Sequence, residues 1–403
     1  MVFMDAHGAG HSPGELSRNS TAELTTAART AITTYILKIA SRCNLACTYC
    51  YMYTGPDQSW RSLPRFMEIE RVRDVLTDIA DYSQSVGLRS VSLVLHGGEP
   101  MLYPPAMMED LLVLVDELLI QKGIDAHISI QTNATVLRST TLQTLIARKA
   151  AFGISLDLSD ESHDRNRVDK RGKGTSAAVH AGVQTIRQAS GSTQPQGALL
   201  VIDPEVTPAQ AYDRLSSLGI PYVDILLPDE NWETADPEAL ADTFGPWLLE
   251  FFELYVSQPR VFQVRWLQSA LKLASGGVWG SDSLGLRGAG TLIVDTDGSY
   301  HFHDVLRTAG ESINATGIHA GASSIAEIES QPVMRMMMDK APYLADECTE
   351  CPVVHICGGG HIAHRFSDHN GLRNASVYCG AIRPLYLALS RLASDTQSGP
   401  NER

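Results

Sequence analysis

The sequence predicts an α/β fold: a partial (β/α)6 barrel of TIM-like type, followed by a smaller cysteine-rich domain. Between Thr34 and Pro228, six short apolar runs rich in β-branched residues alternate with longer segments of helical periodicity, which is the pattern of repeated parallel βα units. Beyond Gln258 the chain becomes rich in glycine and histidine and holds four of its seven cysteines. These two observations predict two domains of different character.

The expected strands of the barrel are TYILKIA (34–40), SVSLVLHGG (90–98), AHISIQTN (126–133), AFGISLDL (151–158), QGALLVID (196–203) and YVDILLP (222–228). Helices are expected between them, over 67–82, 105–121, 140–150 and 176–189. Periodicity alone does not separate a partial barrel from a flat doubly wound sheet. In both architectures ligands bind at the C-terminal ends of the strands, so the site is expected there.

The second part of the chain begins after a helix expected over 237–255. The run TLIVDTDGSYHF is typical of a β-hairpin with its turn at Asp297 and Gly298, and an apolar helix is expected over 382–392. We therefore expect a flexible N-terminal tail over 1–30, the barrel over 31–257 and the second domain over 258–403.

Composition narrows the function. The net charge of −14 and the pI near 5.3 disfavour nucleic acid and anionic membranes as partners, because long-range electrostatics would repel both. No run is long and apolar enough to cross a bilayer, and the polar first thirty residues lack the apolar centre of a signal peptide. A cytoplasmic protein is expected. Seven cysteines in two clusters indicate metal ligands rather than a disulfide framework.

The first cysteine cluster follows the first strand directly, as Cys43, Cys47 and Cys50 within eight residues. Soft thiolates select zinc or iron-sulfur clusters. Three ligands for a four-iron cluster leave one iron open to a small molecule, whereas a structural zinc site is usually closed by a fourth Cys or His at tight spacing. The pattern therefore favours a catalytic iron-sulfur cluster over a zinc site.

This C-x3-C-x2-C motif resembles that of the radical S-adenosylmethionine (SAM) superfamily, and companion motifs follow at successive strand ends. Their order is more informative than any one motif, although Leu158 stands where the family usually has Gly. The resemblance implies a [4Fe-4S] cluster on the three cysteines and SAM bound to it. The residues implied to contact SAM are Tyr49 near the adenine, Gly97, Gly98 and Glu99 on the amino group, Gln131 and Asn133 on the ribose side, and Ser155 and Arg167 on the carboxylate.

The second cluster resembles the SPASM domain of peptide-modifying radical SAM enzymes, which carries auxiliary iron-sulfur clusters. The four ligands matched to the outer auxiliary [4Fe-4S] cluster are Cys348, Cys351, Cys357 and Cys379. Ligands of an inner cluster are missing, with His303 and His361 at two of those positions, so the resemblance implies one auxiliary cluster. A zinc site on the four cysteines remains the alternative. The two histidines are either metal ligands or ordinary hydrogen-bonded residues.

Asp304 is the candidate catalytic residue, because related maturases have an acidic base at this position; a solvated Asp after a hairpin is the alternative. The segments CGGGHIAHRFSDHNGLRNASVYC and ILLPDENW resemble the FxsB-type radical SAM/SPASM peptide maturases. That resemblance implies a ribosomally made precursor peptide as substrate, an aromatic carbon to β-carbon cyclophane as product, and ferredoxin or flavodoxin as electron donor. Thioether formation, epimerisation, formylglycine formation and a catalytically inactive peptide-binding protein are the alternatives.

Overall fold

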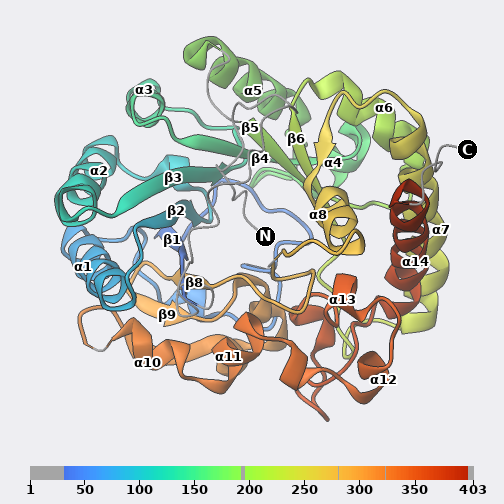
Figure 1. Ribbon diagram of the computed structural model, residues 1–403. Helices are drawn as coiled ribbons and strands as arrows, with labels where there is room; N and C mark the ends of the chain where they lie inside the picture. Colours follow the sequence, from blue (N-terminus) through green and yellow to red (C-terminus); the bar gives the residue numbers. More distant parts are fainter. Residues whose placement is uncertain (1–30, 192–195, 280, 323, 398–403) are drawn as a thin grey trace, which may run out of the picture.

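The computed structural model describes residues 31–191, 196–279, 281–322 and 324–397 (Figure 1). The expected N-terminal tail, 1–30, lies outside the described residues. Six parallel strands pair in chain order and form the curved wall of a partial barrel, so the α/β fold class is confirmed. These strands are β1 (Thr34–Ala40), β2 (Ser90–Gly97), β3 (Asp125–Thr132), β4 (Ala151–Asp157), β5 (Gln196–Val201) and β6 (Tyr222–Leu226).

Helices connect these strands, and most of them cover the outer face of the wall (Figure 1). Their apolar sides are buried against the strands, which gives the barrel a core of aliphatic residues. Glycines in the left-handed conformation end three of the helices, at Gly87, Gly191 and Gly219. The helices are α1 (Ile69–Val86), α2 (Pro105–Leu118), α3 (Ser139–Ala147), α4 (Asp160–Asn166), α5 (Ser176–Ser190) and α6 (Pro208–Leu218).

The sheet continues beyond the six strands that the sequence predicts. The hairpin expected over 291–302 forms as β8 (Thr291–Val294) and β9 (Ser299–His301), with Gly298 at φ +85° in its turn. Strand β8 pairs in parallel with β1, β10 (Ala315–His319) pairs with β9, and the short β7 (Gln263–Val264) pairs with β6 at the other end. One ten-stranded sheet therefore includes strands from both expected domains. Hairpin periodicity gives no signal for which strand the hairpin will join.

The C-terminal segment crosses the open side of the wall and closes the cavity inside it. Helix α14 (Cys379–Gln397) packs along α7 (Pro237–Ser257) and against α8 (Arg265–Ala274), and Figure 1 shows α14 and α7 side by side. The loop between α13 (Val354–Cys357) and α14 then faces the C-terminal ends of the strands. None of the described helices is long and apolar enough to cross a membrane.

Candidate active site

One cavity of about 230 Å³ opens at the C-terminal ends of the barrel strands, as expected for this architecture. It is lined by every residue that the sequence predicts for the first cluster and for SAM: Cys43, Cys47, Tyr49, Cys50, Gly97, Gly98, Glu99, Gln131, Asn133, Ser155 and Arg167. Asp304 and the four C-terminal cysteines do not belong to this lining. The sequence motifs of four strand ends therefore meet in one place.

The three cysteines lie on the loop after β1, with their thiols free and partly exposed. The Sγ of Cys43 accepts hydrogen bonds from the Leu45 amide at 3.3 Å and the Asn133 side-chain amide at 3.6 Å. Burial raises the pKa of Cys43 to about 12 and that of Cys50 to about 11, so the free thiols stay protonated near neutral pH. A bound metal would be needed to hold them as thiolates.

The spacing of the sulfur atoms bears on which metal fits. Tetrahedral zinc bonds sulfur at about 2.3 Å and so brings its sulfur ligands to about 3.8 Å from one another. Within the described residues, no trio of cysteine sulfurs lies mutually within 4.8 Å. The donor set suits a larger polynuclear cluster better than a single zinc ion.

Three hydrogen bonds fix the side chain of Glu99, which the sequence predicts to contact SAM. Its carboxylate accepts hydrogen bonds from the Met101 amide at 2.9 Å, the Asn133 amide at 2.8 Å and the Thr132 hydroxyl at 2.7 Å. Burial raises the pKa of Glu99 to about 7, although each of these three hydrogen bonds lowers it. Because a carboxylate has about four acceptor positions, one remains for a cationic ligand such as an ammonium group.

Gly97 and Gly98 let the end of β2 pass directly against the cysteine loop. Gly97 has φ +130°, and a Cβ added there would lie 2.1 Å from the carbonyl oxygen of Ala40. A Cβ on Gly98 would lie 2.5 Å from the backbone of Arg42. Side chains are therefore excluded at both positions, and the close approach lets the Gly98 amide donate to the Ala40 carbonyl at 2.7 Å and the Glu99 amide to the Arg42 carbonyl at 3.2 Å.

The opposite wall is polar and held by charge. Tyr49 donates a hydrogen bond to Asp157 at 2.5 Å, Arg167 pairs with the same carboxylate at 3.3 Å, and the guanidinium lies 5.3 Å from the centre of the Tyr49 ring. Gln131 donates to the hydroxyl of Ser155 at 3.0 Å. Asp157 thus orients both Tyr49 and Arg167; the segment GISLDL that contains it belongs to the radical SAM resemblance, but its sequence does not predict this positioning role.

Asp304 sits behind the cavity in a buried ion pair with Lys38 of β1. Tyr51 donates to the same carboxylate oxygen at 2.9 Å, and Arg307 lies 3.8 Å from the other oxygen. Burial alone would raise the pKa of Asp304, but Lys38, His96 and Arg307 hold it well below its usual range. In this arrangement Asp304 is an ionised carboxylate whose Oδ2 is paired, while its buried Oδ1 has no hydrogen-bond partner among the described residues.

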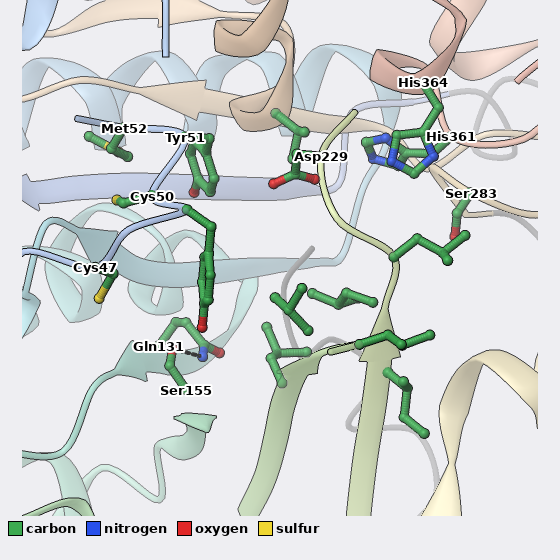
Figure 2. Close-up of a pocket in the computed structure, with 18 of the residues that line it drawn as sticks. Cys47, Cys50, Tyr51, Met52, Gln131, Ser155, Asp229, Ser283, His361 and His364 are labelled. Carbon is green, nitrogen blue, oxygen red and sulfur yellow. Dashed lines mark hydrogen bonds between the residues drawn. The ribbon is translucent and has the colours of Figure 1, made fainter. Parts of the chain in front are cut away.

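Asp229 also lines the cavity. The sequence does not predict it as a site residue, although it lies in the segment ILLPDENW that resembles the FxsB-type maturases. It lies on the loop after β6 and makes no hydrogen bond or ion pair with the described residues through its carboxylate. In Figure 2, Asp229, Tyr51 and the imidazoles of His361 and His364 line one side of the cavity, across from Gln131 and Ser155. Burial raises the pKa of Asp229 to about 6.

Beyond the polar wall the cavity becomes apolar. Side chains from the ends of β5 and β6 and from helices α7, α8 and α14 form this part, which we call the apolar chamber. Its members are Leu199, Val201, Ile225, Leu226, Leu227, Leu248, Trp266, Ile382 and Tyr386. The chamber is contiguous with the cysteine loop, so a side chain held in it would lie beside the SAM-facing residues.

The four C-terminal cysteines come together from three helices and a loop below α14. Cys348 belongs to α12 (Asp346–Thr349), Cys357 ends α13 and Cys379 begins α14. Burial, together with the neighbouring thiols, raises the pKa of Cys348 to about 11 and that of Cys357 to about 12. Cys379 lies 31 positions after Cys348 in the sequence, so this grouping is harder to predict from spacing than the first one.

Comparison with known proteins identifies the fold family. Residues 37–211 match the model of the Radical SAM superfamily, which agrees with the α/β fold of this part of the chain. A serine-type anaerobic sulfatase-maturating enzyme from Klebsiella aerogenes is 25% identical over 334 residues, which cover 81% of this chain and 78% of the relative. A cysteine-type enzyme of the same name from Clostridium novyi is 26% identical over 149 residues, which cover 37% and 38%.

Solved structures extend the likeness over both halves of the chain. Native anSMEcpe with bound AdoMet has a TM-score of 0.74 at 19% identity and covers 90% of this chain and 99% of its own. Streptococcus suis SuiB bound to precursor peptide SuiA has a TM-score of 0.56 at 14% identity, with coverages of 87% and 76%. At these identities the likeness establishes the fold, and the specific FxsB-type assignment stays a prediction.

Proposed function

We propose that this protein is a radical SAM enzyme that abstracts hydrogen from a ribosomally made precursor peptide and joins an aromatic ring carbon to a β-carbon. The observation that carries the proposal is the single cavity that connects the three cysteines, the SAM-facing residues and the apolar chamber. A peptide-modifying radical enzyme needs these three parts in contact, because the radical must react with its target side chain in a site from which solvent is excluded.

The residues present suit the two cofactors. Cys43, Cys47 and Cys50 would hold a [4Fe-4S] cluster, with SAM held by Glu99, Arg167 and the other residues of the cavity wall. When bound, the pair supplies a 5'-deoxyadenosyl radical by one-electron cleavage of SAM. The cysteines Cys348, Cys351, Cys357 and Cys379 would hold one auxiliary [4Fe-4S] cluster.

The chain's own task is to hold the target side chain and to exclude water. An aromatic side chain fits the apolar chamber, where Trp266 and the leucines of β5 and β6 offer only carbon surface. After loss of a hydrogen atom from the β-carbon, the new bond to the ring carbon leaves one proton and one electron to be removed. The auxiliary cluster is the proposed electron acceptor, and an external ferredoxin or flavodoxin the proposed donor.

Two carboxylates compete as the proton acceptor. Asp304, proposed from the sequence, is held in an ion pair with Lys38 and would have to leave it to accept a proton. Asp229 faces the cavity without a partner among the described residues and has a pKa of about 6, so it is ionised at neutral pH and basic enough to take one. We propose Asp229 as the acceptor and Asp304 as a positioning residue for Lys38 and Tyr51.

The first test is anaerobic co-expression with candidate precursor peptides encoded beside the gene, followed by mass spectrometry. A cyclophane lacks two hydrogen atoms and blocks fragmentation between the joined residues. Changing Cys43, Cys47 and Cys50 together to Ala should remove both SAM cleavage and product while iron at the C-terminal cysteines remains. Zinc in place of iron, with no cleavage of SAM under reduction, would instead indicate a metal-stabilised peptide-binding protein.

A second candidate function is oxidation of a Ser or Cys residue to formylglycine. The observation that favours it is the 25% identity, over 81% of this chain, to a serine-type sulfatase-maturating enzyme. Oxidation of Ser also removes two hydrogen atoms, so mass alone does not separate the two reactions. A hydrazide probe does, because it labels the formylglycine aldehyde and leaves a cyclophane unlabelled. Alkylation of free Cys identifies a thioether, and deuterium uptake without a mass loss identifies epimerisation.

A further inference from the structure

A group of three side chains, two buried and one partly buried, lies next to the main cavity, behind the loop that carries the C-terminal cysteines. Asp282, His303 and His361 each offer one ligand atom, and these atoms lie within 4.8 Å of one another. The Asp282 Oδ2 is 3.2 Å from the His303 Nε2 and 3.9 Å from the His361 Nε2, and the two imidazole rings are 5.0 Å apart. The side chains of His303 and His361 are 3% and 9% exposed.

We propose that Asp282, His303 and His361 bind a divalent transition-metal ion of the zinc type. Two imidazoles and one carboxylate are a donor set that such ions take, usually with a fourth position left open. Ligands of a tetrahedral ion with bonds of about 2.0 to 2.1 Å lie about 3.3 Å apart, close to the shortest edge of this triangle. The other two edges reach that length through side-chain rotation.

His361 supplies the second observation that points to a ligand. Its Nδ1 is buried and has no hydrogen-bond partner among the described residues. The ring stands between His303 and His364, with 5.0 Å to each, and neither contact satisfies that nitrogen. The Nε2 of the same ring faces Asp282 at 3.9 Å, which is too long for a hydrogen bond, so neither ring nitrogen of His361 is hydrogen-bonded to the described residues. Because buried imidazoles are almost always hydrogen-bonded or metal-bound, an ion in the triangle, bound through Nε2, would supply the missing partner.

His303 and Lys340 set the conditions for binding. The Nδ1 of His303 accepts a hydrogen bond from the Val305 amide at 3.2 Å, which puts its proton on Nε2, toward Asp282. Ligation through Nε2 requires the proton to move to Nδ1, where it would face the Val305 amide, so the Val305 contact must be given up. Lys340 lines the same small cavity, with its ammonium at 3.4 Å from the Leu284 carbonyl, and its charge opposes a cation. Removing that charge should therefore strengthen binding.

The test is zinc binding by the full chain after its iron-sulfur clusters are assembled, so that cysteines are occupied. One equivalent of Zn²⁺ is added anaerobically, free metal is removed by gel filtration, and bound zinc is counted by mass spectrometry of the metals. About one zinc per chain is expected, with nitrogen and oxygen but no sulfur neighbours in its X-ray absorption spectrum. Asp282→Asn and His361→Ala should each lower zinc affinity at least tenfold, whereas Lys340→Met should not lower it.

The exposed His355 provides the matched control, because His355→Ala removes an imidazole from the same loop region outside the triangle. Iron and sulfide contents of every variant report whether it has folded, and His303→Gln serves as a further test if His361→Ala has not. Absence of bound zinc in the wild-type chain, sulfur neighbours around it, or unchanged affinity in Asp282→Asn would each overturn the proposal. None of these readouts depends on the peptide substrate or on turnover.

Discussion

Replacement of Asp229 by Asn tests the step that distinguishes bond formation from radical generation. The substitution keeps the size of the side chain and removes its ability to accept a proton. A positioned general base contributes about 10²- to 10⁴-fold to a rate, so cross-linked product should fall by at least about a hundredfold. Cleavage of SAM should continue, because Asp229 is separate from the residues expected to hold SAM and the first cluster.

The pH dependence follows from the pKa of about 6. The active form is the carboxylate, so in the wild-type enzyme the yield of product per SAM cleaved should fall as pH drops through that value, by roughly tenfold between pH 7 and pH 5. Burial is the main cause that raises this pKa, and the carboxylates of Glu230 and Asp304 raise it further; Tyr51 and Tyr378 lie near the same carboxylate. In Asp229→Asn the dependence should disappear.

The assay measures 5'-deoxyadenosine and cross-linked peptide separately in the same anaerobic reaction. The neighbouring Glu230→Gln is the matched control, since Glu230 is outside the cavity lining, and Asp304→Asn is run in parallel. The reasoning is refuted if Asp229→Asn forms product at the wild-type ratio to 5'-deoxyadenosine. It is equally refuted if Asp304→Asn alone separates cleavage from product, because Asp304 would then be the acceptor.

Three further predictions concern the walls of the site. Gly97→Ala should lower the free energy of unfolding by at least about 2 kcal/mol, measured by thermal denaturation, because its Cβ would meet the Ala40 carbonyl. Glu99→Gln should weaken SAM binding by roughly 10- to 100-fold in isothermal titration, through loss of one charge-assisted bond. Lys38→Met should lower the free energy of unfolding by about 3 to 5 kcal/mol, because it leaves the buried Asp304 carboxylate without its partner. The decrease should be smaller in the double variant Lys38→Met/Asp304→Asn, which has no unpaired charge. The wild-type pair holds the folded pKa of Asp304 low, so its contribution is complete above the unfolded pKa near 4. The single variant should instead lose stability in denaturant titrations as pH rises above the unfolded pKa near 4, because burial without the Lys38 charge raises the folded pKa of Asp304.

The barrel and its cofactor wall were accessible from the sequence because their determinants are local. Each strand is a short apolar run, and most of the residues predicted to contact SAM sit within a few positions of a strand end, where parallel strands bring their termini to one edge. Glu99, Gln131 and Ser155 are thus placed by three strands, and the structure brings all three to one cavity. No long-range pairing had to be known to group them.

The parts that escaped prediction depend on long-range contacts. Lys38 and Asp304 are separated by 266 residues, and the pair forms only because β8 joins the free edge of β1. Nothing in the hairpin sequence specifies that edge. Asp282 lies in a glycine-rich loop whose sequence has neither helical nor strand periodicity, so its approach to His303 and His361 is not predictable from that sequence. For such residues the chemical type is visible in the sequence and the partner is not.

The contrast between Asp304 and Asp229 follows from what surrounds each carboxylate. Both lie near the cavity, yet Lys38, His96 and Arg307 keep the first ionised, while burial makes the second a weaker acid with a pKa of about 6. Two carboxyl groups whose environments push their pKa values apart are suited to different tasks, one to a fixed charge and the other to proton transfer. A position matched to a family motif is therefore a poor guide to the proton acceptor when a buried lysine forms an ion pair with its carboxylate. The loop after β6, which carries the unpaired carboxylate into the cavity, is where substitutions should change the outcome of the reaction without stopping SAM cleavage.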